Sequence, residues 1–327
     1  MNLLILSAGT RNKVVQYFKQ ECREGDRIIA TDCSNLAPAV YEADVFYLVP
    51  RITHPDYLKI ILDICKKEQI TGVLSLIDPE LSLLAKHEEQ FKALGVTVIG
   101  SPYDLVETCF NKYAMYEKLT QMRIATGKCY LDKELFYRDK AAGRITYPVF
   151  VKPVCGSASM HINKVSSDKE LEVLFDLYED LMIQEFMDGQ EYGADVYLDL
   201  LTGKVSTIFV KKKIKMRAGE TDKSVSVKDE ALFSLIQGFA EDMGFKGIID
   251  IDIFKIKGTY YISEVNPRFG GGYPHAYESG VNVPRLIMQN LRGEETSPDI
   301  GSYEEGICMM KYNEVLIRRI PEAEIVE

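Results

Sequence analysis

Residues Ser263–His275 read "SEVNPRFGGGYPH", which places a carboxylate, an amide and an arginine within five residues and then adds three consecutive glycines. Glu264 and Asn266 end an apolar run, and residues two apart on a β-strand point to the same face of the sheet. Both side chains offer oxygen atoms, the ligand type that Mg²⁺ prefers. The stretch therefore predicts a strand end where two oxygen ligands reach one cation; a solvent-exposed edge strand is the alternative.

The preceding segment, "IIDIDIFKI", supplies a further carboxylate, because its isoleucines alternate with acidic residues and leave one face of a strand acidic. A two-residue turn at Lys257–Gly258 would put Asp252 and Glu264 on opposite faces of a hairpin. A three-residue turn, Lys257–Thr259, would place the two carboxylates opposite each other. We expect the three-residue turn, so that Asp252, Glu264 and Asn266 share one surface. Such an acidic cluster needs a cation or basic groups beside it.

Two earlier segments have features of a nucleotide site. In "PVFVKPVCGSAS", Lys152 ends a predicted strand. The backbone N–H groups and hydroxyls of Gly156, Ser157 and Ser159 could hold phosphate oxygens, although no GxxxxGK[ST] motif is present. In "IQEFMDGQEYG", a strand leads into a turn and Glu191 follows, so the backbone could hold a base and the carboxylate a ribose. Each segment taken alone is also consistent with an ordinary strand exit.

The first hundred residues alternate short apolar runs with amphipathic stretches. "LLILSAG", "RIIATD", "VFYLVP", "GVLSLID" and "VTVIG" predict strands, with helical segments between most of them. This alternation predicts an α/β unit with a parallel sheet over residues 1–105. Its first turn, "SAGTRN", lacks GxGxxG, which argues against a dinucleotide-binding domain. The rest of the chain, with paired strands and helices, predicts an α+β region.

Asp78, in "LIDPEL", lies where a predicted strand gives way to a helix. Ligands of open α/β sheets gather at the carboxyl ends of the strands, so Asp78 is a candidate to contact a substrate. A helix-capping role is an equally good interpretation of this aspartate.

Composition excludes several classes of protein. The net charge is -10, which argues against a nucleic-acid-binding surface. No apolar stretch approaches membrane-spanning length, and we expect no signal peptide at the start. The seven cysteines form no CxxC pair and only four histidines are present, which favours neither a disulfide framework nor a zinc site. We expect reduced cysteines and a cytoplasmic location.

The order and spacing of these segments resemble the ATP-grasp superfamily, and most closely single-unit enzymes similar to one half of the carbamoyl-phosphate synthetase large chain. The resemblance covers about residues 1–300; "EVNPR" is its most specific motif, and "FVKP…GSAS", "IQEFMDGQE" and "DIDIF" also match. It implies a Rossmann-like pre-ATP-grasp domain at 1–105 and a two-lobed ATP-grasp domain at 106–300. The implied lobes are about 106–183 and 184–300, and a C-terminal strand and tail, which we expect to be poorly ordered, occupy 301–327.

The resemblance also implies how ATP is bound. Lys112 and Lys152 would hold the nucleotide phosphates, and the loop from Cys155 to Ser159 would fold over the triphosphate. The adenine hinge would be formed by Glu185, Phe186 and Met187. Glu191 would bind the ribose.

The remaining implied roles concern the metal and the reaction. Asp252, Glu264 and Asn266 would hold two Mg²⁺ ions, with Mn²⁺ as a substitute. Arg268 would stabilise the transferring phosphoryl group, with Lys152 as the second catalytic cation.

The expected reaction is the ATP-dependent ligation of a carboxylate to an amine through an acylphosphate. The acceptor pocket should include Asp78, Arg217, Gly271 and Gly272. Arg217, in "MRAGETDKS", is a candidate partner for a carboxylate or phosphate, and the glycines let the chain pass close to a ligand.

Two alternatives stay open. One is an enzyme that forms carboxyphosphate or carbamoyl phosphate; the other is a catalytically silent ATP-binding regulator. We expect small-molecule carboxylate and amine partners, no nucleic acid and no membrane, and we leave open a homodimer.

Overall fold

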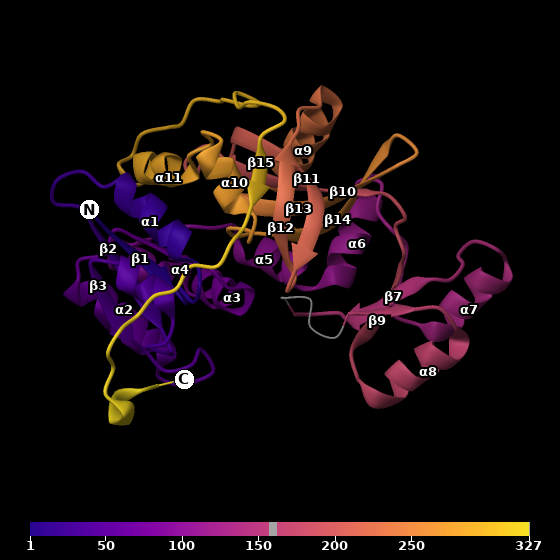
Figure 1. The fold of residues 1–327 in the computed structure, drawn as a ribbon, viewed down its shortest axis with the longest axis horizontal. Helices are drawn as coiled ribbons and strands as arrows, with labels where there is room; N and C mark the ends of the chain where they lie inside the picture. Colours follow the sequence, from indigo (N-terminus) through magenta and orange to yellow (C-terminus); the bar gives the residue numbers. More distant parts are fainter. Residues whose placement is uncertain (157–161, 327) are drawn as a thin grey trace.

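The strands within residues 1–156 and 162–326, which the computed structural model describes, form three β-sheets. Figure 1 shows the first sheet at the N-terminal side, the largest sheet in the middle and a small lobe around β7 and β9 at the other side. This arrangement confirms the predicted α/β plus α+β fold. No helix in the described residues is both long and apolar enough to cross a membrane.

The first sheet is parallel and has the strand order β3-β2-β1-β4-β5. Its strands are β1 (Asn2–Leu6), β2 (Arg27–Asp32), β3 (Val45–Leu48), β4 (Gly72–Ser75) and β5 (Thr97–Val98). The connections contain α1 (Asn12–Gln20), η1 (Pro38–Glu42), α2 (Tyr57–Lys67), α3 (Asp78–Lys86) and α4 (Glu88–Lys92). All five residues of β1 are buried, as expected for a central parallel strand covered on both faces.

A small lobe follows the helices α5 (Tyr103–Phe110) and α6 (Lys112–Gln121). Its antiparallel sheet, in the order β6-β9-β7-β8, consists of β6 (Cys129–Tyr130), β7 (Val149–Pro153), β8 (Asn163–Val165) and β9 (Leu181–Glu185). The helices α7 (Lys133–Ala141) and α8 (Asp168–Leu177) belong to the same lobe. Its hydrophobic core is separate from that of the rest of the chain and contains the fully buried Phe136.

The largest sheet is antiparallel, in the order β14-β13-β10-β11-β12-β15. Its strands are β10 (Gln190–Leu198), β11 (Val205–Arg217), β12 (Glu220–Ser226), β13 (Gly247–Ile256), β14 (Thr259–Asn266) and β15 (Cys308–Met310). The helices of this part are α9 (Glu230–Met243), α10 (Tyr273–Glu278) and α11 (Val283–Leu291), and η2 (Glu322–Glu324) lies near the C-terminus. Phe18 of α1 packs edge-on against Phe269, so this sheet and the first unit share one hydrophobic core.

The turn of the β13–β14 hairpin differs from the prediction. Ile256 pairs with Thr259, which leaves a two-residue turn instead of the expected three-residue one. Lys257 and Gly258 have φ angles of 49° and 88°, the left-handed conformations that a tight hairpin turn requires. The three-residue turn is therefore wrong.

A β-bulge restores the register that the turn alone would not give. Ile253 pairs with Ile262, yet Asp252 pairs with Glu264, so Ser263 is an extra residue on β14. A bulge of this kind places two residues of one strand against one of the other. Asp252 and Glu264 consequently face the same side of the sheet, as predicted, although for a different reason.

The C-terminal tail also differs from the expectation of poor order. Beyond β15 it returns to the first unit (Figure 1). There the Ser34 hydroxyl donates to the Val326 carbonyl at 2.7 Å, and the Asn35 amide donates to the Glu324 carbonyl at 2.6 Å. Residues 311–326 therefore connect the largest sheet to the first one.

Candidate active site

One face of the largest sheet carries the predicted metal ligands. Asp252 lies opposite Glu264 on the neighbouring strand, and Asp250 lies opposite Asn266. Lys152 of the small lobe approaches this face, with its Nζ 3.9 Å from a carboxylate oxygen of Glu264. The structure thus brings the predicted ligands together with a predicted phosphate-binding lysine.

Lys213 on β11 is a residue of this site that sequence reasoning missed. Its Nζ lies 2.5 Å from Asp252 and 2.8 Å from Glu191, so one cation bridges a predicted metal ligand and the predicted ribose ligand. Burial lowers the pKa of Lys213, but the charges of Asp252 and Glu191 outweigh it and raise the pKa well above its usual range. The run Lys211–Lys213 could have pointed to this residue. The first and third lysines of such a run lie on the same face of a strand, because alternate residues share a face.

Lys211 reaches the same face, where it forms a buried ion pair with Asp195 of β10. Between the two lysines lies Gly193, at which a Cβ atom would be 3.1 Å from Lys211 Cε and 3.2 Å from Lys213 Cε. The glycine provides the space that both lysine side chains need to cross β10. Burial and the charge of Asp252 raise the pKa of the neighbouring Asp250 to about 7.

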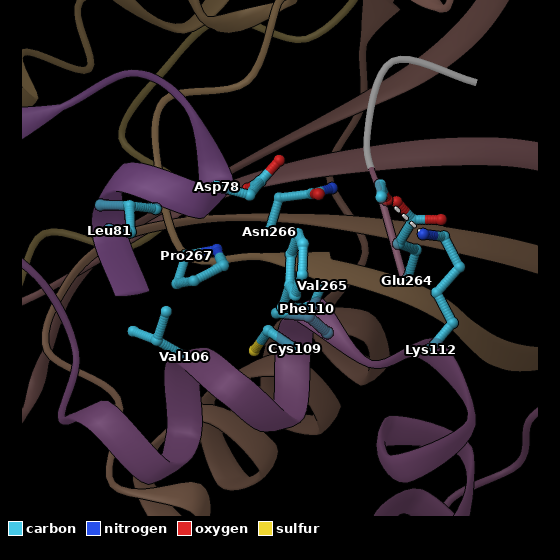
Figure 2. A pocket seen from close by; sticks show the side chains of 11 residues that line it. Asp78, Leu81, Val106, Cys109, Phe110, Lys112, Glu264, Val265, Asn266 and Pro267 are labelled. Carbon is cyan, nitrogen blue, oxygen red and sulfur yellow. Dashed lines mark hydrogen bonds between the residues drawn. The ribbon is translucent and has the colours of Figure 1, made fainter. Parts of the chain in front are cut away.

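A pocket opens between the helices α3, α5 and α6 and the end of β14 (Figure 2). Lys112 and Glu264 lie at one end of it, Asp78 and Asn266 at another, and the residues between them are mostly apolar. The Lys112 ammonium donates to the Gly156 carbonyl, which holds the start of the predicted phosphate loop beside Glu264. Ser157 and Ser159, also predicted to bind phosphate, lie outside the described residues.

The predicted adenine hinge follows β9. Glu185 is fixed by backbone pairing with Lys128 and accepts a hydrogen bond from the Lys128 N–H at 3.0 Å. The Phe186 ring lies 5.4 Å from that of Phe150, and Met187 is buried. These contacts fix the chain direction here, but the roles of Glu185, Phe186 and Met187 toward a base stay predictions.

Asp78 and Arg268 form a two-pronged ion pair. Arg268 Nε lies 2.9 Å from Asp78 Oδ1, and Nη2 donates to Oδ2 at 3.1 Å. The helix-capping alternative for Asp78 is wrong, because Ile77 is the N-cap of α3 and no side chain caps the helix. Arg268 Nη2 also donates to the Asn266 side-chain oxygen at 3.2 Å, so Asp78 aligns an arginine beside a predicted metal ligand.

The three consecutive glycines each lie against a charged side chain. A Cβ at Gly270 would overlap the Asp250 carboxyl group, and one at Gly271 would lie 2.5 Å from Glu220 Cδ. At Gly272 a Cβ would lie 2.8 Å from Lys211 Cε. None of the three has a positive φ angle, so they provide space for charged groups and not a special backbone conformation.

Arg217 is not brought together with Asp78. Its guanidinium lies 2.8 Å from Asp222 on the neighbouring strand and is about half exposed, at 51%. Glu220, its partner across the tight β11–β12 turn, is the residue that reaches Gly271. The structure therefore places the acidic residue of this loop, and not the arginine, against the glycines.

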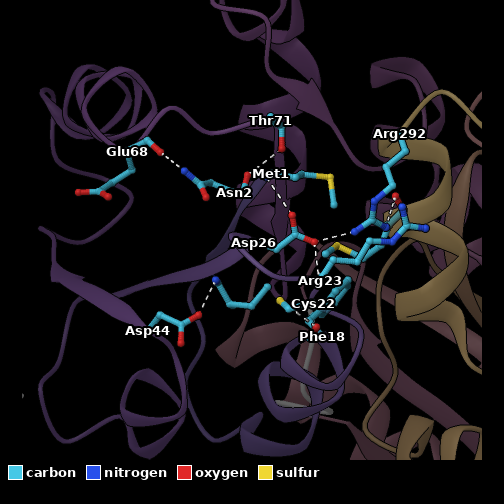
Figure 3. A network of polar contacts seen from close by, with 12 residues as sticks. Met1, Asn2, Phe18, Cys22, Arg23, Asp26, Asp44, Glu68, Thr71 and Arg292 are labelled. Carbon is cyan, nitrogen blue, oxygen red and sulfur yellow. Dashed lines mark hydrogen bonds and ion pairs between the residues drawn. The ribbon is translucent and has the colours of Figure 1, made fainter.

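Polar contacts hold the first unit against the rest of the chain on the side away from the pocket. Arg292, just after α11, lies 2.6 Å from Asp26, which also accepts a hydrogen bond from the Arg23 N–H at 2.9 Å (Figure 3). Burial alone would raise the pKa of Asp26. The hydrogen bond from Arg23 and the positive charges of the N-terminus and Arg292 have a larger opposite effect, so the pKa lies below its usual value. This anchor helps to fix the first unit, and with it Asp78, relative to β14.

The ligand set suits Mg²⁺ that is shared with phosphate groups. No cluster of three or more histidine, cysteine, aspartate or glutamate side chains in the described part of the chain is arranged to hold a metal by itself. Two carboxylates and one amide, from Asp252, Glu264 and Asn266, leave coordination positions for water and phosphate oxygens, the usual arrangement of Mg²⁺ at nucleotides. Lys213 and Lys152 offset the acidic charge of this face.

Comparisons with known proteins agree with this geometry. Residues 3–99 match the family described as PylC-like, N-terminal domain, and residues 178–315 match the family described as ATP-grasp in the biosynthetic pathway with Ter operon. The arginine-specific carbamoyl phosphate synthase large chain of Geobacillus stearothermophilus is 25% identical over 273 residues, which are 79% of this chain and 26% of that protein. The large chain of Clostridium botulinum is 24% identical over 298 residues, 85% of this chain and 26% of that protein. The chain thus spans about a quarter of the length of these relatives.

Solved structures show the same fold. The biotin carboxylase domain of Hydrogenobacter thermophilus 2-oxoglutarate carboxylase, solved with MgADP and bicarbonate, has a TM-score of 0.74 at 17% identity and covers 94% of this chain and 73% of its own. The L-amino acid ligase of Bacillus licheniformis has a TM-score of 0.69 at 20% identity, and the match covers 90% of this chain and 75% of the ligase. The ADP complex of N5-carboxyaminoimidazole synthetase from Staphylococcus aureus has a TM-score of 0.72 at 16% identity, and the match covers 91% of this chain and 79% of the synthetase. Residues 178–315 thus match an ATP-grasp family, and the chain is similar to part of the carbamoyl phosphate synthase large chain.

Proposed function

We propose that the protein is an ATP- and Mg²⁺-dependent ligase that activates a carboxylate as an acylphosphate for attack by an amine. The observation that carries this proposal is the pairing of Asp252 with Glu264, beside Asn266, on a face that Lys152 approaches from the small lobe. This set offers oxygen ligands for a cation and a positive charge for phosphate at one face of the largest sheet.

The proposed roles in binding ATP and Mg²⁺ fall to different residues. Lys112 and Lys152 bind the phosphates, Glu185 to Met187 contact the base, and Glu191 binds the ribose. Mg²⁺, when bound, neutralises negative charge on the phosphates. We propose two ions, with Mn²⁺ as a substitute, held by Asp252, Glu264 and Asn266.

Arg268 is the residue that we propose acts on the transferring group. A carboxylate oxygen of the acid attacks the γ-phosphorus, the bond to the β–γ bridging oxygen breaks, and ADP leaves. The amine then attacks the carbonyl carbon, phosphate leaves, and the amine loses a proton. Fixed donors such as Arg268, held by Asp78, stabilise charge that develops in the first step.

A second candidate uses bicarbonate as the acid and forms carboxyphosphate. The similarity to carbamoyl phosphate synthase large chains favours it. The protein spans only about a quarter of those chains, so their complete reaction is a weaker proposal than the ligase.

Calorimetric titration of ADP with and without Mg²⁺ tests nucleotide binding. ADP release from ATP, screened over carboxylic acids with amines and over bicarbonate with ammonia, then tests catalysis, and mass spectrometry identifies the product. We expect one acid–amine pair to stimulate release and Glu264→Gln to abolish it. Mg²⁺-dependent binding without stimulation by any pair would favour a silent regulator, and no binding would overturn the proposal.

We further propose small-molecule substrates and a cytoplasmic location. A homodimer is proposed because the Hydrogenobacter domain was solved as a dimer. Light scattering coupled to size-exclusion chromatography tests the oligomeric state.

A further inference from the structure

Three charged side chains from distant parts of the chain meet beside the glycines. Arg11, in the loop between β1 and α1, lies with Nη2 2.9 Å from one carboxylate oxygen of Glu220. Lys311, which follows β15, lies with Nζ 2.7 Å from the other. Two cations thus hold one carboxylate, and neither Arg11 nor Lys311 has a place in the nucleotide or metal site proposed above.

This cluster adjoins the acceptor side of the active site. The Glu220 carboxylate lies against Gly271, next to Gly270, which lies against Asp250. Burial lowers the pKa of Arg11; the charge of Glu220 raises it, and the positive charge of Arg268 lowers it further. Arg11 therefore shares one electrostatic environment with Arg268, the arginine proposed to contact the transferring phosphoryl group.

Glu220 is more open to solvent than the neighbouring Asp78. Its side chain is 38% exposed, whereas that of Asp78 is 9% exposed. Glu220 begins β12, directly after the two-residue turn Ala218–Gly219. Ala218 has a φ angle of 49°, a left-handed conformation that costs a residue with a Cβ atom about 1 kcal/mol or more.

We propose that Arg11 and Lys311 form the binding site for a carboxylate of the acceptor substrate, and that Glu220 fills this site in the substrate-free protein. The proposal rests on the proposed function, in which a carboxylic acid must lie beside Arg268. Exchange of Glu220 for the substrate carboxylate leaves both cations paired, which avoids the cost of a partly buried cation without a partner. The acceptor is accordingly an acid, and Arg11 is the residue of the first unit that selects it.

The probe for the test is malonate, a small dicarboxylate, titrated into the full-length protein by ligand-observed NMR. Glu220→Gln removes the internal carboxylate, and we expect the Kd for malonate to fall about tenfold, which is about 1.4 kcal/mol. The double variant Arg11→Gln/Glu220→Gln should return the Kd to the wild-type value or above it. Glu89→Gln carries the same charge change on the exposed surface of α4 and should leave the Kd unchanged.

Three results would overturn the proposal: a Kd for Glu220→Gln within about twofold of wild type, tight binding that survives loss of Arg11, or an equal fall in Kd for Glu89→Gln. Circular dichroism and melting temperatures establish that each variant is folded. Mg²⁺-dependent ADP binding is measured on the same samples. If the wild-type protein fails to bind ADP, the ligase proposal fails, while the malonate series still decides whether Arg11 and Lys311 form an anion site.

Discussion

Asp252 and Glu264 lie opposite each other across the β13–β14 hairpin because Ser263 forms a β-bulge between the turn and the site. A two-residue turn alone would send the two carboxylates to opposite faces, since a shift of one residue inverts the side chains of a strand. The extra residue thus brings both proposed metal ligands to one face, while the turn keeps a common tight geometry.

Deletion of Ser263 should remove the bulge and leave the metal site in place. In the deletion variant Glu264 follows Ile262 directly, so it lies opposite Asp252 in a regular ladder and both carboxylates keep one face. Calorimetry should show Mg²⁺-dependent ADP binding weakened by no more than about 10- to 100-fold, the cost of changes in the outer shell of a metal site. Ser263→Ala keeps the bulge and should bind normally, whereas Glu264→Gln, which removes a ligand carboxylate, should bind more weakly than the deletion variant; the reverse order would contradict the assignment.

Lys213→Met should destabilise the protein in the absence of ligands and make its stability more dependent on Mg²⁺ and ADP. The change leaves Glu191 and Asp252, which are 29% and 27% exposed, without their shared cation. Breaking a buried pair costs about 3–5 kcal/mol, so a partly exposed one should cost about 2–3 kcal/mol. Bound Mg²⁺ would replace part of the lost charge. Urea unfolding with and without MgADP measures both effects.

The control for Lys213 is its neighbour Lys212, which alternation places on the other face of β11. Lys212→Met should change the free energy of unfolding by less than about 0.5 kcal/mol. An equal loss in both variants would mean that Lys213 stabilises the sheet in a general way and has no link to the site.

The sequence predicted the features that depend on local patterns. Continuous apolar runs identified the parallel strands, and alternation placed Glu264 and Asn266 on one surface. Asp252 was placed with them through a turn that the structure does not have. The bulge escaped prediction because a serine in a strand carries no signal for an extra residue. The turn was consequently predicted with the wrong length.

The missed residues depend on pairing between distant segments. Lys213 meets Glu191 only through the register of β10 and β11, and Arg11 meets Glu220 only after the first unit packs on the largest sheet. Spacing along the chain contains no information on such contacts. The same reason explains why the contact between Asp78 and Arg268 could not be predicted, because the two residues are 190 positions apart in the chain.

The buried His275 should make the folded protein less stable at acid pH. Its Nδ1 lies 2.8 Å from the Ser224 hydroxyl and its Nε2 3.0 Å from the Ile307 carbonyl, so a neutral ring links α10 to β12 and the chain before β15. Burial lowers the pKa of His275 to about 4, and the charge of Lys211 lowers it too. Unfolded histidine binds a proton near pH 6.5, so the unfolded state holds more protons between pH 6.5 and 4.

The stabilisation from neutral His275 is thus complete above pH 6.5 and is lost as the pH falls toward 4, by at most about 1.4 kcal/mol per pH unit. Urea unfolding at pH 7.5 and at pH 5 measures the change. His275→Gln should reduce this pH dependence, whereas His54→Gln, at an exposed site, should keep it. An unchanged slope in His275→Gln would assign the acid sensitivity to other groups.

Arg268→Ala should remove most turnover and leave ADP binding close to wild type. Asp78 holds the Arg268 guanidinium by two contacts, so the donor is already oriented before the reaction begins. Loss of one oriented donor to a developing negative charge typically costs about 10² to 10³ in rate. Single-turnover phosphoryl transfer, measured with the acid and amine that the screen identifies, reports this step without product release.

Asp78→Asn separates the orientation of Arg268 from its charge. The variant keeps the arginine and a side chain of the same shape but loses the charge-assisted contact, so we expect a smaller loss than for Arg268→Ala. Arg217→Ala is the matched control, because Arg217 pairs with Asp222 at an exposed position and should affect transfer little. A rate for Arg268→Ala equal to wild type would leave the Asp78–Arg268 pair as a structural link between the first unit and β14. A rate for Asp78→Asn as low as that of Arg268→Ala would mean that the arginine acts only when the first unit holds it in place.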